Sequence, residues 1–581
     1  MKRIYHVLFV IAIIIISFKC QKESSGNTIN NTQSNSQSSP IKATLQGNVL
    51  DEYGQPAAGV KISAGLKTGT TDAYGYFSLE DAALDKNAAL AIAEKPGYFK
   101  AFRSFRATVG ANRVVIKLIK KTLAGTVNAI TGGEVTLSNG TKILLTANSV
   151  TKASGGSYAG NIEMYADYID PTARDISASM PGSFMADDKD KNRVVLSSYG
   201  MLAVELQSPA GEKLQIISGN TATLTIPIPL SLLSSSPAAI SLWYVDENTG
   251  IWKEEGNAKK NGTSYVGVVK HFSFWNSDVS FPSVSFTVTL KTADNLFIKN
   301  TLVRISAASD TAKNYAYGYT DSLGQVSGLV PANTNLLLDV MSQCYNIAWS
   351  KNIGPFAQNT NLATIVVPNT ASSLVTITGK LISCSNTPVT NGYAAVYFNN
   401  SSYFVKVDSK GAFVLQIINC SASAQAFEIA GVDENRQQQS SILTIPLTGS
   451  VTDAGTISAC GTSSLRYINY TLDGADYSTT GSTLYANSYP ASAALFNTYI
   501  GCNTIRFDFT NDPIAGDFPL YSLEVLTYKR IRVTQPLNVA LTAFPKKSGD
   551  FYTGSFSGNF IDSAAITVTH NISCTFRIKK Y

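Results

Sequence analysis

Short runs of alternating apolar and polar residues recur about every ten residues along this chain, between clusters of Gly, Asn, Asp and Pro. Two clear examples are Val60-Lys61-Ile62-Ser63-Ala64 and Val114-Val115-Ile116-Lys117-Leu118. A period of two places neighbouring side chains on opposite faces of a strand, and helical periodicity is almost absent after residue 20. Short strands at this spacing are typical of antiparallel sandwiches. We therefore predict an all-β fold of tandem antiparallel β-sandwich domains.

The length of the chain allows several such domains. It has 581 residues, of which 44% are hydrophobic and 15% charged, so apolar surface is available for more than one core. At about 100–150 residues per domain, the part after residue 40 accommodates about four or five domains. We divide this part into five modules, called the first to the fifth, over residues 41–121, 122–280, 281–370, 371–461 and 462–581.

The start of the chain has a different pattern. Met1-Lys2-Arg3 precedes an apolar run from Val7 to Phe18, and Cys20 follows. A cationic start and about a dozen apolar residues are typical of a secretory signal, and the run is shorter than the ~20 residues of a membrane-spanning helix. We predict a signal peptide over residues 1–19, with an uncleaved membrane anchor as the alternative.

The segment Ile16-Ser17-Phe18-Lys19-Cys20 resembles a bacterial lipobox, in which Lys19 is an unusual residue before the cysteine. The resemblance, to lipoproteins of Bacteroidetes-type bacteria, implies a lipidated N-terminal Cys20, an outer-membrane anchor and export to the cell surface. From Ser24 to Pro40 the residues are almost all polar, and they bury too little apolar surface to offset the entropy of ordering. We expect residues 20–40 to be a lipidated cysteine and a flexible, disordered tether.

The charge pattern argues against a nucleic-acid partner. The formal net charge is +6, and Lys2, Arg3 and Lys19 in the expected signal contribute three of these charges. No basic run elsewhere approaches the cluster expected of a phosphate-binding face. The remaining surface is therefore nearly neutral.

Three segments repeat one turn pattern, with Asp at the first position and Gly three residues later. They are Asp72 to Gly75, Asp321 to Gly324 and Asp408 to Gly411, and an apolar strand follows each. An Asp side chain at this place accepts backbone N–H groups, and Gly permits a positive φ. The pattern therefore predicts tight hairpin turns. A calcium loop, the alternative, needs more carboxylates close together.

The first of these turns belongs to a longer pattern. It comprises Gly47 to Val60, with Gly54-Gln55-Pro56 and Gly59-Val60, then Thr71 to Phe77, and then Lys95-Pro96-Gly97-Tyr98. This pattern resembles the carboxypeptidase regulatory-like domain and implies a small prealbumin-like sandwich. The resemblance does not imply catalysis, because the regulatory module lacks the zinc site of the peptidases. We expect Ig-like sandwiches for the third and fourth modules, the fourth with cysteines, and a C-terminal β domain for the fifth.

The second module contains the run from Trp243 to Gly256, which resembles a segment of cartilage intermediate layer proteins. Those proteins also contain a regulatory-like module. We interpret the run as two strands joined by a turn from Asp246 to Gly250, with Trp243 and Trp252 on one face.

The cysteines are unevenly distributed. After Cys20 none occurs before Cys344, and the others are Cys384, Cys420, Cys460, Cys502 and Cys574. An even number of six in an exported protein favours disulfides, with a mixture of paired and buried free thiols as the alternative. Gly379 to Cys384 and Gly455 to Cys460 place a cysteine at the same offset from a glycine. We predict at least one disulfide among Cys384, Cys420 and Cys460, with Cys384–Cys460 and Cys384–Cys420 as competing pairs.

The tripeptide His271-Phe272-Ser273 is the sharpest chemical motif. It resembles the cleavage site of self-cleaving β-domains such as the nucleoporin autoproteolytic domain. That resemblance implies Ser273 as the nucleophile that attacks the Phe272 carbonyl and His271 as the base. The alternative, which we favour, is an aromatic strand end that packs in the core.

Other catalytic signals are missing from the sequence. His271 and His570 are the only histidines of the expected mature chain, because His6 lies in the signal. No HExxH, GxSxG, P-loop or dinucleotide pattern occurs. We therefore expect no enzyme, no cofactor and no metal site. Tyrosines at the start of the fifth module are candidates for a carbohydrate platform: Tyr467, Tyr470, Tyr477, Tyr485, Tyr489 and Tyr499.

The sequence thus predicts a non-enzymatic, lipid-anchored cell-surface protein that displays β-sandwich modules for adhesion or ligand binding. Its expected partners are the outer-membrane lipid, through Cys20, and a protein or glycan ligand. Two alternatives stay open. One is a carbohydrate-binding lipoprotein of a glycan uptake system, and the other is a self-cleaving module that breaks between Phe272 and Ser273.

Overall fold

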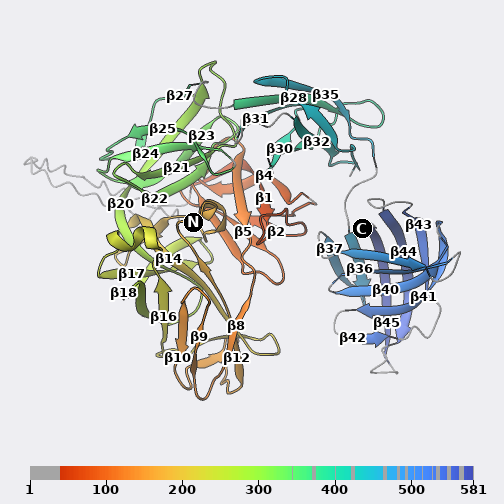
Figure 1. The fold of residues 1–581 in the computed structure, drawn as a ribbon, viewed down its shortest axis with the longest axis horizontal. Helices are drawn as coiled ribbons and strands as arrows, with labels where there is room; N and C mark the ends of the chain where they lie inside the picture. The colour runs from red at the N-terminus through yellow and green to blue at the C-terminus, as the bar shows by residue number, and fades with distance from the viewer. Residues whose placement is uncertain are drawn as a thin grey trace, which may run out of the picture. The chain divides into compact units, whose positions relative to one another are not determined.

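The computed structural model describes residues 39–579, except 73, 343, 369–373, 400, 420–425, 437, 462–466, 481–483, 491–494, 503, 513, 526–527, 532–536, 546–550 and 562–567. Within these residues the regular structure is almost entirely β-strand, and the helices are the single turn α1 (Ile176–Ser179) and the 3-10 segment η1 (Leu230–Ser235). The strands form several sheets (Figure 1). The predicted all-β fold of β-sandwich modules is confirmed.

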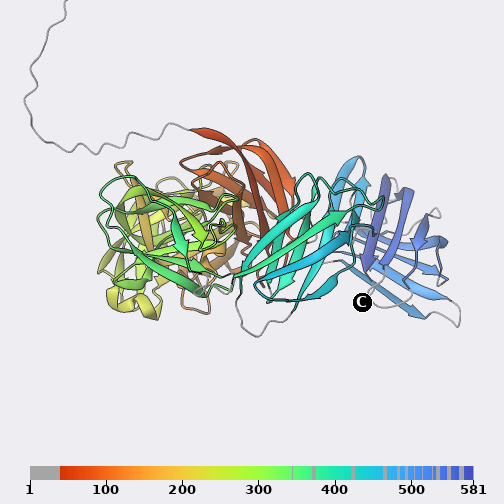
Figure 2. The same ribbon diagram turned by 90° about the horizontal axis from the view of Figure 1, so that it is seen from above.

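The first module is a sandwich of two sheets, with the strand orders β4-β1-β7 and β3-β2-β5-β6. The two layers appear in red and orange in Figure 2. The central strand β1 is antiparallel to β4 and parallel to β7. Apolar side chains of the two inner faces, such as Leu45, Ile62 and Ile116, form the core between the sheets. The strands are β1 (Pro40–Leu50), β2 (Lys61–Ala64), β3 (Lys67–Thr70), β4 (Tyr76–Asp85), β5 (Ala89–Glu94), β6 (Ala101–Phe105) and β7 (Asn112–Lys117).

The second module is built on a large sheet in which β14 (Arg193–Gln207) pairs with β20 (Phe274–Thr292). Its side chains form a core of their own around Trp275, Tyr265 and Leu202. The other strands are β8 (Leu123–Asn128), β9 (Gly133–Thr136), β10 (Lys142–Leu145), β11 (Val150–Lys152), β12 (Asn161–Ile169), β13 (Met185–Asp187), β15 (Lys213–Ile216), β16 (Ala222–Pro227), β17 (Ala239–Asp246), β18 (Ile251–Asn261) and β19 (Ser264–Val269).

Trp243 and Trp252 of the second module lie as the sequence predicts. β17 and β18 are antiparallel and are joined by the turn at Asp246, whose carbonyl accepts the Gly250 N–H at 2.7 Å. Trp243 and Trp252 are both fully buried and belong to the same core cluster. Their indole N–H groups donate to the carbonyls of Asp278 and Ser183, at 3.3 and 2.7 Å.

The third module has the topology of the first. Its central strand is the C-terminal half of β20, which is antiparallel to β23 and parallel to β26 and β27. The second sheet has the order β22-β21-β24-β25. The strands are β21 (Leu302–Ala307), β22 (Asp310–Tyr319), β23 (Gln325–Pro331), β24 (Leu336–Met341), β25 (Ile347–Ile353), β26 (Thr360–Asn361) and β27 (Ile365–Val367).

The fourth module repeats the topology again, because β28 is antiparallel to β31 and parallel to β35. Its second sheet has the order β30-β29-β32-β33, and β34 also pairs with β32. The strands are β28 (Leu374–Ile382), β29 (Gly392–Phe398), β30 (Ser401–Lys406), β31 (Ala412–Ile418), β32 (Ala426–Asp433), β33 (Gln438–Gln439), β34 (Leu443–Pro446) and β35 (Val451–Ser458).

The repeated turns are confirmed in these three modules. Asp72, Asp321 and Asp408 each accept two backbone N–H groups through Oδ1, at 2.8–3.0 Å. Gly75, Gly324 and Gly411 have φ angles of 68°, 70° and 77°. An L side chain is strained in this region, and a Cβ on Gly75 would lie 2.4 Å from the Val49 carbonyl oxygen.

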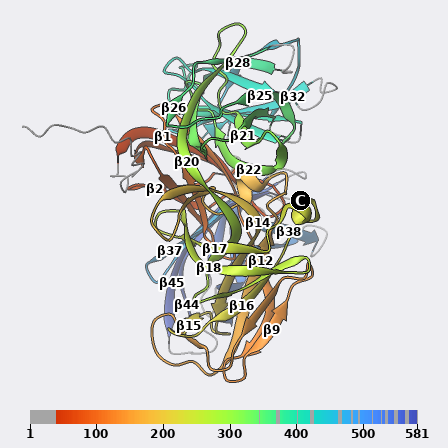
Figure 3. The same cartoon turned by 90° about the vertical axis from the view of Figure 1, so that its left-hand side faces the viewer.

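The long strand β20 belongs to two modules at once (Figure 3). Its N-terminal half pairs with β14 as far as Pro282, and from Ser283 it pairs with β23. One core cluster contains Phe102 of the first module, Trp243 of the second and Val330 of the third. The first three modules therefore share apolar packing, and β20 passes through the position where the sequence analysis divides the second module from the third.

The fifth module is one sheet with the order β37-β36-β45-β44-β43-β41-β40-β39-β38. It has a separate core that includes Phe507, Tyr552 and Phe576. The strands are β36 (Tyr467–Leu472), β37 (Ala475–Thr480), β38 (Tyr485–Pro490), β39 (Phe496–Gly501), β40 (Ile505–Asn511), β41 (Gly516–Val525), β42 (Tyr528–Ile531), which pairs with β41, β43 (Asn538–Ala543), β44 (Phe551–Ile561) and β45 (Thr569–Lys579).

Candidate functional site

The tripeptide His271-Phe272-Ser273 forms a bend directly before β20. Phe272 is 7% exposed and packs in the core of the second module. The Gln215 side chain on β15 holds its backbone, because Phe272 N–H donates to Gln215 Oε1 at 2.7 Å and Gln215 Nε2 donates to the Phe272 carbonyl at 3.1 Å. The Ser273 hydroxyl donates to the Phe274 carbonyl at 3.1 Å. Among the described residues no hydrogen bond joins Ser273 to His271.

The His271 ring is held by aromatic neighbours. Its centroid lies 4.7 Å from that of Tyr244 and 5.1 Å from that of Trp275. The Trp275 indole N–H donates to the His271 carbonyl at 3.1 Å, and Glu255 Oε2 lies 3.9 Å from His271 Nε2. Burial lowers the pKa of His271, and Glu255 opposes this shift. The ring is therefore neutral at pH 7 and fixed by packing.

We expect the purified chain to remain one polypeptide at this site. Self-cleavage needs the Ser273 hydroxyl at the Phe272 carbonyl carbon in a strained peptide, whereas the hydroxyl here bonds forward to Phe274. Denaturing electrophoresis after long incubation measures this. Two fragments that break between Phe272 and Ser273, and that disappear in Ser273→Ala, would contradict the expectation.

The cysteine prediction is confirmed in one of its two forms. Cys384 and Cys460 form a disulfide, with their Cα atoms 4.6 Å apart. Cys420, the competing partner, and Cys20 lie outside the described residues. Cys344 is also disulfide-bonded, whereas Cys502 and Cys574 are buried free thiols of the fifth module.

The candidate tyrosines of the fifth module are buried or half-buried where the structure describes their side chains. Tyr470 is 2% exposed and belongs to the core, and its ring stacks on that of Tyr477 at 4.8 Å. The Arg506 guanidinium lies 5.6 Å from the centre of the Tyr499 ring. Tyr467, Tyr477, Tyr485 and Tyr499 are half-buried, and the Tyr489 side chain lies outside the description.

The turn aspartates of the first and third modules also form hydrogen bonds with side chains of another module. Asp321 Oδ2 accepts the hydroxyl of Thr108 from the first module at 2.7 Å. Asp72 Oδ2 accepts the phenol hydroxyl of Tyr393 from the fourth module. Beside it, Tyr76 packs on Tyr393, with ring centroids 4.6 Å apart. One carboxyl oxygen thus closes the turn while the other joins two modules.

The contact between Asp72 and Tyr393 is expected to depend on pH. Burial raises the pKa of Asp72 to about 6, and the hydrogen bond from Tyr393 opposes this. The unfolded chain releases this proton near pH ~3.9. The stabilisation of the folded chain by protonated Asp72 is therefore fully present below pH ~3.9 and is lost as the pH rises through about 6. Unfolding midpoints of wild type and Asp72→Asn from pH 4 to 7.5 measure it, and the variant is expected to lose this decline.

Asp408 is the matched control for this measurement. It occupies the same turn in the fourth module, but the backbone N–H groups of Ala412 and Lys410 lower its pKa. Asp408→Asn is therefore expected to change the pH profile in the opposite direction. Relative to wild type, the variant should be less stable at neutral pH, and this difference should shrink towards pH 3. Identical profiles for wild type and Asp72→Asn would contradict the account of Asp72.

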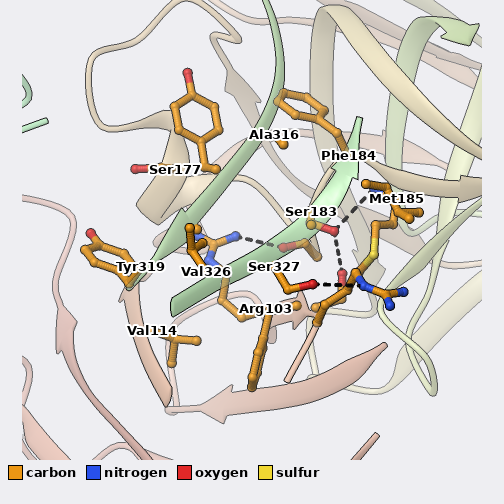
Figure 4. Close-up of a pocket in the computed structure, with 18 of the residues that line it drawn as sticks. Arg103, Val114, Ser177, Ser183, Phe184, Met185, Ala316, Tyr319, Val326 and Ser327 are labelled. Carbon is orange, nitrogen blue, oxygen red and sulfur yellow. Dashed lines mark hydrogen bonds between the residues drawn. The ribbon is translucent and has the colours of Figure 1, made fainter. Parts of the chain in front are cut away.

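A cavity of about 80 Å³ lies where the first three modules meet (Figure 4). Sequence reasoning did not identify it, because its wall comes from strands of three modules that are far apart in the chain. Its polar wall includes Arg103, Arg106 and Arg113 from the first module, Ser177 and Ser183 from the second, and Tyr319 and Ser327 from the third.

The described residues offer little else that binds a ligand through charge. They contain no group of three or more His, Cys, Asp and Glu side chains placed to hold a metal ion. His570 pairs with Asp473 at 2.6 Å in the fifth module. None of the helical segments among these residues has the length and hydropathy of a membrane span.

Comparison with known proteins gives a partial match in sequence. No family model matches the chain. Cartilage intermediate layer protein 2 of Homo sapiens is 29% identical over 126 residues, which are 21% of this chain and 10% of that protein. The protein of the same name from Mus musculus is 27% identical over 158 residues, which are 25% of this chain and 13% of that protein. The matched part is thus little more than a tenth of these relatives.

Similar solved structures include pilins. The shaft pilin SpaA of Lactobacillus rhamnosus GG is 10% identical, with 31% of this chain and 98% of that chain covered and a TM-score of 0.18. The major pilin subunit BcpA of Bacillus cereus is 10% identical, with 72% and 100% covered and a TM-score of 0.12. Scores this low do not establish a common arrangement of the whole chains.

Proposed function

We propose that this protein is a non-enzymatic, lipid-anchored scaffold of the cell surface that displays β-sandwich modules for adhesion or ligand binding. The observation that carries the proposal is the coupling of the modules. β20 is shared by the second and third modules, and one apolar core includes residues of the first three. Such coupling makes a stiff spacer, which suits a protein that presents a binding surface away from its anchor.

Two further features support an exported protein. The Cys384–Cys460 disulfide fits an oxidising compartment. The segment from Met1 to Cys20, with the polar residues up to Pro40, fits a lipoprotein signal followed by a tether. The cavity between the modules, at about 80 Å³, is small beside the roughly 300–1,000 Å³ of clefts that bind drug-sized ligands.

Anchoring is tested with Cys20→Ser. We expect wild type in the membrane fraction and in the detergent phase, labelled by a fatty-acid analogue. The variant is expected to lose the label and either to be released or to accumulate as the uncleaved precursor, because the lipid is attached to that sulfur. Cys502→Ser is the matched control and should keep the label. A normal, lipidated band for Cys20→Ser would contradict the proposed anchor.

The ligand class is tested separately. Full-length protein without the signal is screened on a glycan array and on immobilised extracellular-matrix proteins. Saturable binding to a sugar would assign the protein to glycan uptake instead of protein-mediated adhesion. Saturable binding to a protein surface supports adhesion, and binding to neither class would contradict both.

A further inference from the structure

The cavity between the first three modules has an unusual charge. Arg103 on β6, Arg106 directly after it and Arg113 on β7 line it, and no Asp or Glu is among the described residues of its wall. Arg103 and Arg113 are only 7% and 5% exposed. Figure 4 shows Arg103 with Ser183, Ser327 and Tyr319 around this space. Positive charge therefore gathers on one buried surface.

Neither of the two most buried arginines has an anionic partner in the described residues. Arg103 donates only to backbone carbonyls, those of Met180, Gly182, Val115 and Phe102. Arg113 Nη2 donates to Asn48 Oδ1 at 2.8 Å, and its buried Nε has no hydrogen-bond partner in the part of the chain that the structure describes. The guanidinium of Arg113 also lies 5.7 Å from the centre of the Tyr319 ring.

The acidic groups nearby do not neutralise this charge. Asp321 lies near the cavity, but its carboxylate oxygens already accept hydrogen bonds from the Thr108 hydroxyl and from backbone N–H groups of its own turn. Burial and Arg193 lower the pKa of Arg106, and Asp85 raises it. Burial lowers the pKa of Arg103 to about 10, so this side chain stays charged at neutral pH. Burial of a charge without a counter-charge is unfavourable, and an anion in the cavity supplies that counter-charge.

The remaining wall is suited to a small anion with oxygen atoms. A single water needs ~10–15 Å³ of such space, so about 80 Å³ holds a group of about five heavy atoms with some water. The hydroxyls of Ser104 and Ser183 are 2.8 Å apart on one side, and Arg106 Nε donates to Ser327 Oγ at 3.3 Å on another. Guanidinium and hydroxyl donors together are typical of oxyanion recognition.

We propose that this cavity is an internal binding site for a tetrahedral inorganic oxyanion, phosphate or sulfate. The anion accepts hydrogen bonds from Arg113 Nε and from the serine hydroxyls of the wall. Because donors from three modules converge on it, its binding stabilises their packing. The site is independent of the proposed surface function and needs no reaction.

The test uses the full chain without the signal, after exhaustive dialysis into a buffer free of phosphate, sulfate and chloride. Titration calorimetry with inorganic phosphate, and then with sulfate, is expected to give one saturable site. The protein is also denatured and its released anions are counted by ion chromatography, which detects any anion that dialysis does not remove. The number of sites found by titration plus the number of anions released on denaturation is expected to be about one per chain.

Three variants link the binding to the cavity. Arg113→Gln is expected to weaken binding at least tenfold, because it removes both the charge and the free Nε donor, whereas Arg113→Lys keeps the charge and should weaken it less. Arg506→Gln, in the fifth module, is the matched control and should bind as wild type does. Circular dichroism verifies that each variant is folded.

Several outcomes would overturn the proposal. They are wild type that neither binds nor releases an oxyanion, binding of chloride alone, and binding that Arg113→Gln and Arg113→Lys leave unchanged. If Arg113→Gln does not fold, the wild-type titration and the Arg113→Lys variant decide. A stabilisation of the protein that rises linearly with sulfate concentration, and equally in every variant, also contradicts the proposed site. Excluded salts stabilise folded proteins in this way without binding to a site.

Discussion

Trp243→Ala is expected to lower the free energy of unfolding of the coupled modules by about 3–5 kcal/mol. The side chain is fully buried in the core shared by the first three modules, and its indole N–H donates to the Asp278 carbonyl. Alanine leaves a cavity at this place and a backbone carbonyl without its donor. Chemical denaturation followed by tryptophan fluorescence and circular dichroism measures the loss.

Trp349→Ala is the matched control, since Trp349 on β25 is half-buried and packs against the same core without belonging to its buried residues. Its expected loss is less than half that of Trp243→Ala. The separate core of the fifth module should keep its unfolding midpoint in both variants. Equal losses for the two variants would contradict the position that we assign to Trp243.

Removing the Cys384–Cys460 disulfide is expected to lower the stability of the fourth module by about 2–4 kcal/mol. The bond closes a loop with a sequence separation of 76 residues, so its loss gives the unfolded chain many more conformations. The double variant Cys384→Ala, Cys460→Ala avoids an unpaired thiol. Differential scanning calorimetry of the oxidised proteins measures the shift.

The fifth module is the internal control for this experiment, because Cys502 and Cys574 are free thiols. Its transition should not move in the double variant. An unchanged fourth-module transition in the double variant, or alkylation of all six cysteines after Cys20 in denatured wild type without reductant, would contradict the disulfide.

Local patterns predicted the parts of the fold that local chemistry determines. The turn from Asp72 to Gly75 could be predicted because one carboxyl oxygen and one glycine define it. The Cys384–Cys460 pair could be predicted as one of two options from the equal offsets. The reason appears in the structure, where β28 and β35 are parallel and Lys380 is opposite Thr456, so equal offsets bring the two cysteines together.

The continuity of β20 could not be predicted, because proline normally interrupts a sheet. Pro282 lies at the point where β20 changes from pairing with β14 to pairing with β23. It is opposite Val194 of β14, and its carbonyl accepts the Ala332 N–H at 2.8 Å. Its missing N–H is therefore tolerated at this position. The third module also keeps the topology of the first without the Pro56-to-Val60 pattern of that module, since a turn at Asp321 and β-strand pairing suffice.

The arginine cavity illustrates a second limit. Arg103 and Arg113 lie on strands of the first module, and in an isolated sandwich such residues face solvent. Here β13, β22 and β23 of two other modules cover that face. Sequence periodicity shows which residues share a face of a strand, but not which module packs against that face.

The most direct test of the proposed function is protease accessibility on intact cells that express the full chain. We expect added protease to degrade the modules after residue 40 while a periplasmic marker stays whole, and we expect Cys20→Ser to abolish this cell-associated signal. Protection of the wild-type chain until the envelope is permeabilised, or recovery of wild type in the soluble fraction, would contradict a lipid-anchored scaffold on the cell surface.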